Sequence, residues 1–232
     1  MNKDAFDFDN VAKDYRKIHS KNVRLSGAKS EYFSKFKVIN SRKLIKNEIL
    51  NILDIGCGDG LSEVYFEKYF SKAQIYGVDV SQESITACKK RMLTKSKFKQ
   101  FDGINLPFEN NEFDLIFISC VFHHVNRKVV TDLLDECKRV LKIGGQIHIY
   151  EHNPNNPVTR YFVNTCMFDR EVKLISKEAL RKLVENSGFK ILDTNFLLFF
   201  PRWNLFKFLL PLEEVMKHFP LGGQYLIYAK KR

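Results

Sequence analysis

Three alternate glycines, Gly56, Gly58 and Gly60, are the first residues in this chain whose spacing indicates chemistry. They directly follow the apolar segment Asn51–Ile55, and a segment with helical spacing begins near Leu61. Glycine permits a tight turn from strand to helix, and its missing Cβ lets a ligand approach the backbone. The N–H groups of the turn and of the helix start would then face that ligand.

An acidic residue, Asp54, lies two residues before the first glycine. A carboxylate at this place can accept hydrogen bonds from the amides of the turn or from an ammonium group, but it would not help to bind a phosphate. The G-x-G-x-G spacing also differs from the G-x-G-x-x-G of dinucleotide-binding turns. The pattern therefore does not favour a phosphate ligand, and it leaves both roles of Asp54 open.

A second acid, Asp79, ends the next apolar segment at residues 74–80. In a βαβ unit, an acid at the carboxyl end of the second strand can bind both ribose hydroxyls of a nucleoside. The alternative is an acid that caps the following helix. That explanation is weaker, because Ser81 already offers an N-cap for a helix that begins at Gln82. We therefore predict that Asp79 binds ribose.

Histidines follow two further apolar segments, residues 113–119 and 146–150. Side chains at the carboxyl ends of parallel strands line the crevice in which ligands bind. A histidine there can remove a proton from a hydroxyl group, or it can be a hydrogen-bonded structural residue. The candidates for the base are His123, His124 and His152.

These features together resemble the class I S-adenosylmethionine-dependent methyltransferases. The motif D-x-G-x-G-x-G begins at Asp54, the pattern L-P-F, polar loop, F-D-L-I spans residues 106–116, and a helix–Gly-Gly–strand passage spans residues 140–150. The matches lie in the family's order within residues 51–152. The resemblance implies an α/β, Rossmann-like fold with a seven-stranded sheet. Its strands would be mostly parallel with the last one antiparallel, helices would cover both faces, and N-terminal helices would form a lid.

The elements that must position these residues follow from periodicity and turn signals. Strands are expected at residues 51–55, 74–80, 97–101, 113–119, 146–150, within 189–200 and at 224–229. Helices are expected at residues 6–15, 28–40, 61–70, 82–93, 127–141, 160–164 and 176–187, with Gly144 and Gly145 as the stop after the fifth of these. The length of 232 residues predicts one domain. We divide it into a helical cap (1–45), a cofactor-binding core (46–152) and a C-terminal half with a substrate-side loop (153–232).

The family resemblance implies S-adenosyl-L-methionine as cofactor and S-adenosyl-L-homocysteine as its product. It also implies that Asp102 receives the adenine amino group and that Gly103 offers a backbone donor to the ring. The residues expected to contact the cofactor are Asp54, Gly56, Cys57, Gly58, Gly60, Asp79, Val80, Asp102, Gly103 and Ser119.

Methyl transfer from a sulfonium is an in-line displacement with a neutral leaving group, so it can depend mainly on positioning and desolvation. A hydroxyl acceptor also needs a base, for which His124 fits the family pattern better than His123 or His152. The residues expected to contact the acceptor are Tyr15, Glu151 and Asn153. We predict no metal site, because no spacing of His, Asp or Glu typical of metal ligands occurs in the sequence.

The formal net charge of +11 is compatible with nucleic acid, an anionic membrane or an acidic substrate. Because the lysines are widely spread, the charge also fits an ordinary solvated surface. The N-P-P-Y-type motif of enzymes that methylate base amino groups is absent after residues 113–119, where the chain reads Ser-Cys-Val-Phe. We therefore expect a small-molecule, lipid-linked or saccharide acceptor. RNA methylation and a non-catalytic module of the same fold are the alternatives.

Residues 196–212 are unusually apolar. They are suited to the core, to the wall of an apolar acceptor site, or to a surface that dips into lipid beside Arg202 and Lys207. The charged N-terminus, the scattered cysteines and the lack of a long apolar run predict a protein of the reducing cytosol that does not span a membrane. We expect a cytoplasmic location, with peripheral membrane contact as a further option and the oligomeric state open.

Overall fold

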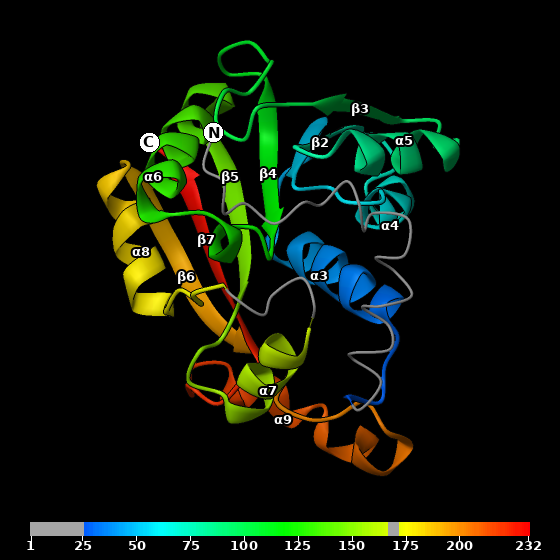
Figure 1. The fold of residues 1–232 in the computed structure, drawn as a ribbon, viewed down its shortest axis with the longest axis vertical. Helices are drawn as coiled ribbons and strands as arrows, with labels where there is room; N and C mark the ends of the chain where they lie inside the picture. Colours follow the sequence, from blue (N-terminus) through cyan, green and yellow to red (C-terminus); the bar gives the residue numbers. More distant parts are fainter. Residues whose placement is uncertain (1–25, 167–171) are drawn as a thin grey trace.

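The computed structural model describes residues 26–166 and 172–232 (Figure 1). Tyr15 and the helix expected at residues 6–15 lie outside these described ranges. No helix within them is long and apolar enough to cross a bilayer.

A seven-stranded sheet with the strand order β3-β2-β1-β4-β5-β7-β6 forms the centre of the fold (Figure 1). Strands β1 to β5 pair in parallel, and β7 pairs antiparallel with both β5 and β6. This confirms the expected mixed sheet with an antiparallel last strand. The strands are β1 Asn51–Ile55, β2 Gln74–Asp79, β3 Ser96–Gln100, β4 Phe113–Ser119, β5 Leu141–His152, β6 Phe189–Leu197 and β7 Gln224–Lys231.

Helices cover both faces of the sheet. On one face, α6 and α8 pack against each other and enclose one hydrophobic core; α3 and α4 enclose a second core on the other face. The helices are α3 Ser30–Leu44, α4 Leu61–Tyr69, α5 Gln82–Lys90, α6 Arg127–Val140, α7 Pro157–Thr165, α8 Lys177–Asn186 and α9 Leu212–Met216, with the 3-10 segments η2 Phe122–His124 and η3 Asn204–Leu209.

The central strand β4 shows why the chain builds this layered fold. Successive side chains of a strand point to opposite faces, and a parallel strand between two helical layers is apolar on both. Ile116 and Ile118 accordingly enter the core beside α6 and α8, whereas Leu115 and Phe117 enter the core beside α3 and α4. All four side chains are fully buried.

The expectation that the glycine pair at residues 144–145 ends a helix is wrong. Helix α6 ends at Val140, and Leu141 already pairs with Phe113 in the sheet. The next aligned pair joins Leu115 to Gln146, so the residues between bulge out of register. Gly144 has a φ of 77° there. Its freedom at positive φ is therefore used in an irregular strand rather than in a helix cap.

The segment after β5 is more regular than the sequence indicated. Helix α7 begins three residues earlier than expected, at Pro157, because the Asn156 side chain accepts a hydrogen bond from the Thr159 amide and proline fits the first helical position. The apolar residues that follow β6 form η3 and α9, which lie next to each other beyond the end of the sheet (Figure 1).

Candidate functional site

The glycine turn after β1 has the conformation that the sequence predicted. The amides of Gly56 and Cys57 donate to the Val78 carbonyl at 2.8 and 3.1 Å, which holds the turn against β2. Gly56, Gly58 and Gly60 all have positive φ. A Cβ on Gly56 would collide with Val121, whereas a Cβ on Gly58 would meet no atom within 4 Å. The missing side chain of Gly56 thus allows Val121, which follows β4, to pack against the turn. Gly58 leaves open space beside its backbone.

Asp79 is fixed at the end of β2 by two backbone amides. Its Oδ2 accepts from Gly58 N at 2.9 Å, and its Oδ1 accepts from Ser81 N at 2.9 Å. Ser81 caps α5 through Ser84 N, as expected. Each carboxylate oxygen can accept a further hydrogen bond, so the anchored Asp79 can still receive hydroxyl groups.

Two buried carboxyl groups lie beneath the turn. Asp54 is only 2% exposed, and burial together with the charges of Glu63, Cys88 and Asp79 raises its pKa strongly, while Lys37 opposes the shift. Glu63, which sequence reasoning missed, is fully buried. Neither of its oxygens has a hydrogen-bond partner among the described residues.

Glu63 owes its place to a glycine on the neighbouring strand. A Cβ on Gly77 would lie 2.7 Å from Glu63 Oε1, so the carboxyl group fills the space that this glycine leaves in β2. Burial raises the pKa of Glu63 to about 8. The side chain is therefore largely protonated at neutral pH.

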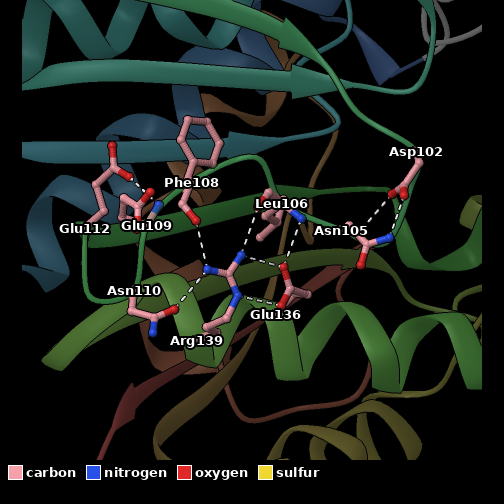
Figure 2. Close-up of polar contacts among 9 residues, drawn as sticks. All are labelled: Asp102, Asn105, Leu106, Phe108, Glu109, Asn110, Glu112, Glu136 and Arg139. Carbon is pink, nitrogen blue, oxygen red and sulfur yellow. Dashed lines mark hydrogen bonds and ion pairs between the residues drawn. The ribbon is translucent and has the colours of Figure 1, made fainter.

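The edge beyond β3 presents Val80, Asp102 and Gly103. Val80 is 46% exposed, and a Cβ on Gly103 would lie 3.4 Å from its Cγ1, so this valine forms an apolar surface beside the glycine. Asp102 is exposed, and its Oδ1 accepts hydrogen bonds from the amides of Ile104 and Asn105. Its Oδ2 accepts from the Asn105 side chain (Figure 2). These hydrogen bonds lower the pKa of Asp102, and the bond from the Asn105 side chain has the largest effect.

The loop that follows Asp102 is held by one arginine of α6 (Figure 2). Arg139 donates to the carbonyls of Leu106 and Phe108 at 2.9 and 2.8 Å and pairs with Glu136 at 2.6 Å. Glu136 in turn accepts from Leu106 N at 3.0 Å. The L-P-F pattern is thus fastened to α6, which sets the direction of the chain between β3 and β4.

A buried carboxylate–histidine pair joins the last residues of β5 to the 3-10 segment η2 that follows β4. Glu151 Oε1 accepts from Val121 N at 2.9 Å and from Phe122 N at 2.7 Å, and its Oε2 lies 2.7 Å from His123 Nδ1. Burial raises the pKa of Glu151, but the charge and hydrogen bond of His123 outweigh it, so the pKa is lowered. Glu151 therefore holds His123 in one orientation.

The three candidate histidines gather at one edge of the sheet, next to the glycine turn. The His123 ring lies 4.1 Å from the His124 ring and 5.2 Å from the His152 ring, measured between centroids. His123 is buried, whereas His124 and His152 are half-buried. The role of each as a base stays a prediction.

Glu151 and Asn153, which we expected to contact the acceptor, have internal partners instead. Glu151 is fully buried, and Asn153 is only 1% exposed. The Asn153 side chain donates to the carbonyls of Pro220 and Gly222 at 3.1 and 2.8 Å. Their positions favour a supporting role, in which Glu151 orients His123 and Asn153 ties the C-terminal segment to β5.

Lys37 is a second residue that sequence reasoning missed. It lies on α3, is 6% exposed, and donates from Nζ to Ser119 Oγ at 2.8 Å and to Cys120 Sγ at 3.3 Å. The sequence signal that could have found Lys37 is its helical spacing with Ser30 and Ser41. All three residues lie on the buried face of α3. Helix α3 thus reaches the end of β4, where Ser119 was expected to bind cofactor.

Comparison with known proteins shows which families and folds this chain resembles. Residues 53–149 match the family described as "Methyltransferase domain". The chain is 31% identical over 143 residues to a phthiotriol/phenolphthiotriol dimycocerosates methyltransferase of Mycobacterium leprae, covering 59% of this chain and 51% of the relative. It is 30% identical over 129 residues to a chloroplastic 2-phytyl-1,4-beta-naphthoquinone methyltransferase of Arabidopsis thaliana, covering 52% and 49%. The chain thus spans about half the length of these curated relatives.

The fold comparison extends over nearly the whole chain. A SAM-dependent methyltransferase of Archaeoglobus fulgidus superposes with a TM-score of 0.70 at 19% identity, covering 97% of this chain and 100% of the other. The match covers the sheet that positions the glycine turn, Asp79 and the histidines. Residues 53–149 therefore match a methyltransferase domain, and the chain as a whole shares the fold of S-adenosylmethionine-dependent methyltransferases of known structure.

Proposed function

We propose that this chain transfers the methyl group of S-adenosyl-L-methionine to a small-molecule, lipid-linked or saccharide acceptor at the carboxyl edge of its sheet. One observation carries the proposal. The chain leaving β4 toward the histidine cluster packs directly on the glycine turn, because Val121 occupies the space that Gly56 leaves. A ligand on the turn and an acceptor at the histidines are therefore neighbours.

The residues of the turn fit the cofactor in their chemistry. Open space beside Gly58 admits a ligand to the backbone, and the anchored Asp79 is placed to accept ribose hydroxyls. The exposed Val80 beside Gly103 suits one face of a planar ring. The buried Asp54 would regain a counter-charge from an ammonium group, which would lower its raised pKa. When bound, the sulfonium supplies an activated methyl group.

For a hydroxyl acceptor, we propose His124 as the residue that takes the proton. It is half-buried beside His123, whose ring Glu151 holds in place. His152, whose ring centroid lies 5.2 Å from that of His123, is the second candidate. Asp102 stays our candidate for the adenine amino group, although its two oxygens already accept bonds within its own loop.

The acceptor is proposed to have an apolar part, because the chain between β6 and β7 exposes a set of large apolar side chains. We call this the tail surface, and it consists of Trp203, Leu205, Phe208, Leu212, Val215, Phe219 and Leu221. It is tied to the edge that carries the histidines, since Asn156 donates to the Leu221 carbonyl at 2.6 Å. The two curated relatives above are named for a lipid and a prenylated quinone acceptor, respectively.

We further propose that the tail surface contacts a membrane. Leu205 and Phe208 are 73% and 74% exposed, and Lys207 between them is also exposed. Arg202, which we expected beside the lipid, is instead nearly buried in a two-bonded ion pair with Glu213 at 2.8 and 2.9 Å. The cation offered to lipid head groups is therefore Lys207.

The test is methyl transfer from labelled cofactor to separate fractions of membrane lipid, oligosaccharide and RNA. We expect binding of S-adenosylhomocysteine at micromolar concentration, about −8 kcal/mol by calorimetry, and labelling of the lipid or saccharide fraction. Labelling of RNA alone, with affinity that falls steeply with salt, would show the RNA alternative to be right. Cofactor binding without transfer to any fraction would indicate a non-catalytic module.

A further inference from the structure

Cys120 differs from the other cysteines of the chain in its exposure. Cys57, Cys88, Cys137 and Cys166 are buried, whereas Cys120 is half-buried where β4 ends. Its backbone has a φ of 59°, which costs a non-glycine residue on the order of 1–3 kcal/mol. Its amide is held by the Tyr150 carbonyl at 2.8 Å, so the surrounding sheet enforces this conformation.

The sulfur of Cys120 lies among polar and charged groups from three elements. Lys37 of α3 donates to Sγ at 3.3 Å, and Gln224 of β7 donates at 3.7 Å. His152 and Glu151 face it from β5, and Tyr225 faces it from β7. Burial raises the pKa of the thiol, Glu151 opposes ionisation, and Lys37 and His152 outweigh both, so that the pKa falls to about 6. Most of Cys120 is then thiolate at neutral pH.

The side-chain amide of Gln224, next to this sulfur, has an acceptor without a hydrogen-bond partner among the described residues. Gln224 is 9% exposed, and its Oε1 has no hydrogen-bond partner in the described part of the chain, although its Nε2 donates to Sγ. A buried amide oxygen without a partner is uncommon and costs free energy. An N–H group of a molecule attached to Cys120 would satisfy it.

We propose that Cys120 is a modification site that forms a mixed disulfide with low-molecular-weight disulfides, and that this adduct separates α3 from β4. The Cys120 thiolate attacks one sulfur of the disulfide, the new S–S bond forms, and the old one breaks. The departing thiolate takes the electron pair and is protonated by water. The disulfide is the oxidant, and no other reactant is required.

The adduct changes the charge balance around Lys37. A disulfide sulfur is neutral, so the buried ammonium of Lys37 loses the anion that it contacts and keeps the neutral Ser119 Oγ as its hydrogen-bond acceptor among the described residues, with the Tyr150 ring 6.0 Å away and the charge of Asp54 acting without a hydrogen bond. A buried charge that loses its partner is strongly unfavourable, so Lys37 should leave the site and α3 should loosen from the sheet. Oxidation of Cys120 would in this way loosen α3 from the sheet without acting on the glycine turn.

The experiment follows the reaction of each cysteine with glutathione disulfide by peptide mass spectrometry between pH 5 and 9. We expect the Cys120 rate to rise about tenfold from pH 5 to 7 and then to level off, while the four buried cysteines react at least about tenfold more slowly at pH 7. Lys37→Met should move the midpoint up by about one pH unit or more, whereas Lys37→Arg should retain it.

Lys35→Met is the matched control, because Lys35 lies on α3 and is exposed. It should leave the midpoint unchanged. Hydrogen exchange then compares the reduced protein with its adduct, and we expect faster exchange in residues Ser30–Leu44 of the adduct. A Cys120 rate that keeps rising through pH 8 overturns the assignment of the reactive thiolate. An adduct at Cys120 with unchanged exchange in α3 overturns the proposed separation of the two elements.

Discussion

Asp79 shows how one side chain can serve both the fold and a ligand. Its two oxygens accept amide hydrogens from the glycine turn and from the start of α5, which fixes the position of the carboxylate before any ligand arrives. A carboxylate held in this way loses little entropy when it accepts hydroxyl groups. Loss of the Asp79 side chain should therefore weaken cofactor binding by removing its contact with the ribose hydroxyls.

We expect Asp79→Ala to weaken S-adenosylhomocysteine binding by about 1.5–3 kcal/mol, since hydrogen bonds to a charged group are lost. Calorimetry with S-adenosylhomocysteine and its 2′-deoxy analogue isolates the ribose contact. The wild-type chain should prefer the normal ligand, and the variant should bind both about equally. Asp132→Ala, on the outer side of α6, is the control and should change neither affinity. A preference that survives in Asp79→Ala would remove this residue from the ribose site.

Glu63 should make the stability of the protein depend on pH. Its pKa in the folded chain is about 8 instead of the ordinary 4.5, because burial disfavours the charged form. The folded chain therefore keeps the proton that the unfolded chain releases. The resulting stabilisation is complete below about pH 4.5 and is lost as the pH rises toward 8.

Replacement of Glu63 by glutamine removes this titration. Relative to wild type, Glu63→Gln should gain on the order of 2–3 kcal/mol in unfolding free energy between pH 5.5 and 8. Urea unfolding at several pH values measures the difference. Glu178→Gln, at an exposed position near the start of α8, serves as the control and should follow wild type. A Glu63→Gln difference that is independent of pH would show that the carboxyl group does not titrate in this range.

At the scale of elements, side chains of α6 hold the conformation of the link between β3 and β4. The loop at residues 104–112 contains little regular structure, and Arg139 and Glu136 satisfy several of its backbone groups (Figure 2). The loop starts at Asp102, at the edge where the adenine is expected. Its attachment to α6 therefore also fixes part of the candidate site.

Arg139→Ala should lower the unfolding free energy by about 1.5–3 kcal/mol, because loop carbonyls and Glu136 lose charged hydrogen bonds. Arg139→Lys should recover only part of this loss, since one ammonium cannot replace the planar guanidinium fork. Chemical denaturation gives both values. Arg181→Ala removes an exposed pair with Glu185 on α8, and its cost should stay below about 0.5 kcal/mol. Equal costs at the two arginines would contradict the role of Arg139.

Sequence reasoning succeeded where the local pattern and the tertiary environment agree. Strands β1, β2 and β4 are short apolar runs that end at turn residues, and each lies within a residue or two of its expected bounds. The start of β5 was misplaced, because Leu141 already pairs with Phe113, a partner that lies far from it in sequence. Glu63 and Lys37 were missed because their burial depends on distant elements: Gly77 of β2 leaves the space that Glu63 fills, and the end of β4 provides the partners of Lys37.

At the scale of the whole molecule, the tail surface holds half of the large apolar side chains that are exposed among the described residues. We expect the protein to sediment with vesicles of phosphatidylglycerol and phosphatidylcholine more strongly than with phosphatidylcholine alone. The double variant Leu205→Ser/Phe208→Ser should weaken vesicle binding at least about tenfold, because both side chains would leave the lipid. Cofactor affinity, measured by calorimetry, should stay unchanged.

The control for the vesicle experiment is Met92→Ser/Ile143→Ser. These two side chains are 85% and 79% exposed but lie outside the tail surface. The control should bind vesicles as the wild-type chain does. Equal losses in the two double variants would contradict a specific membrane contact. A dimer seen by light scattering that only Leu205→Ser/Phe208→Ser abolishes would assign the tail surface to a second copy of the chain.

The place of β7 between β5 and β6 has a consequence for the order in which the chain folds during synthesis. Among the described strands, β6 pairs only with β7, which the ribosome makes later, whereas β1 to β5 can pair with one another before β6 is made. We therefore expect the nascent chain to pass through a stage with a five-stranded parallel sheet whose β5 edge is open. Open strand edges are sites of aggregation, so translation speed between residues 189 and 231 should affect the yield of folded protein.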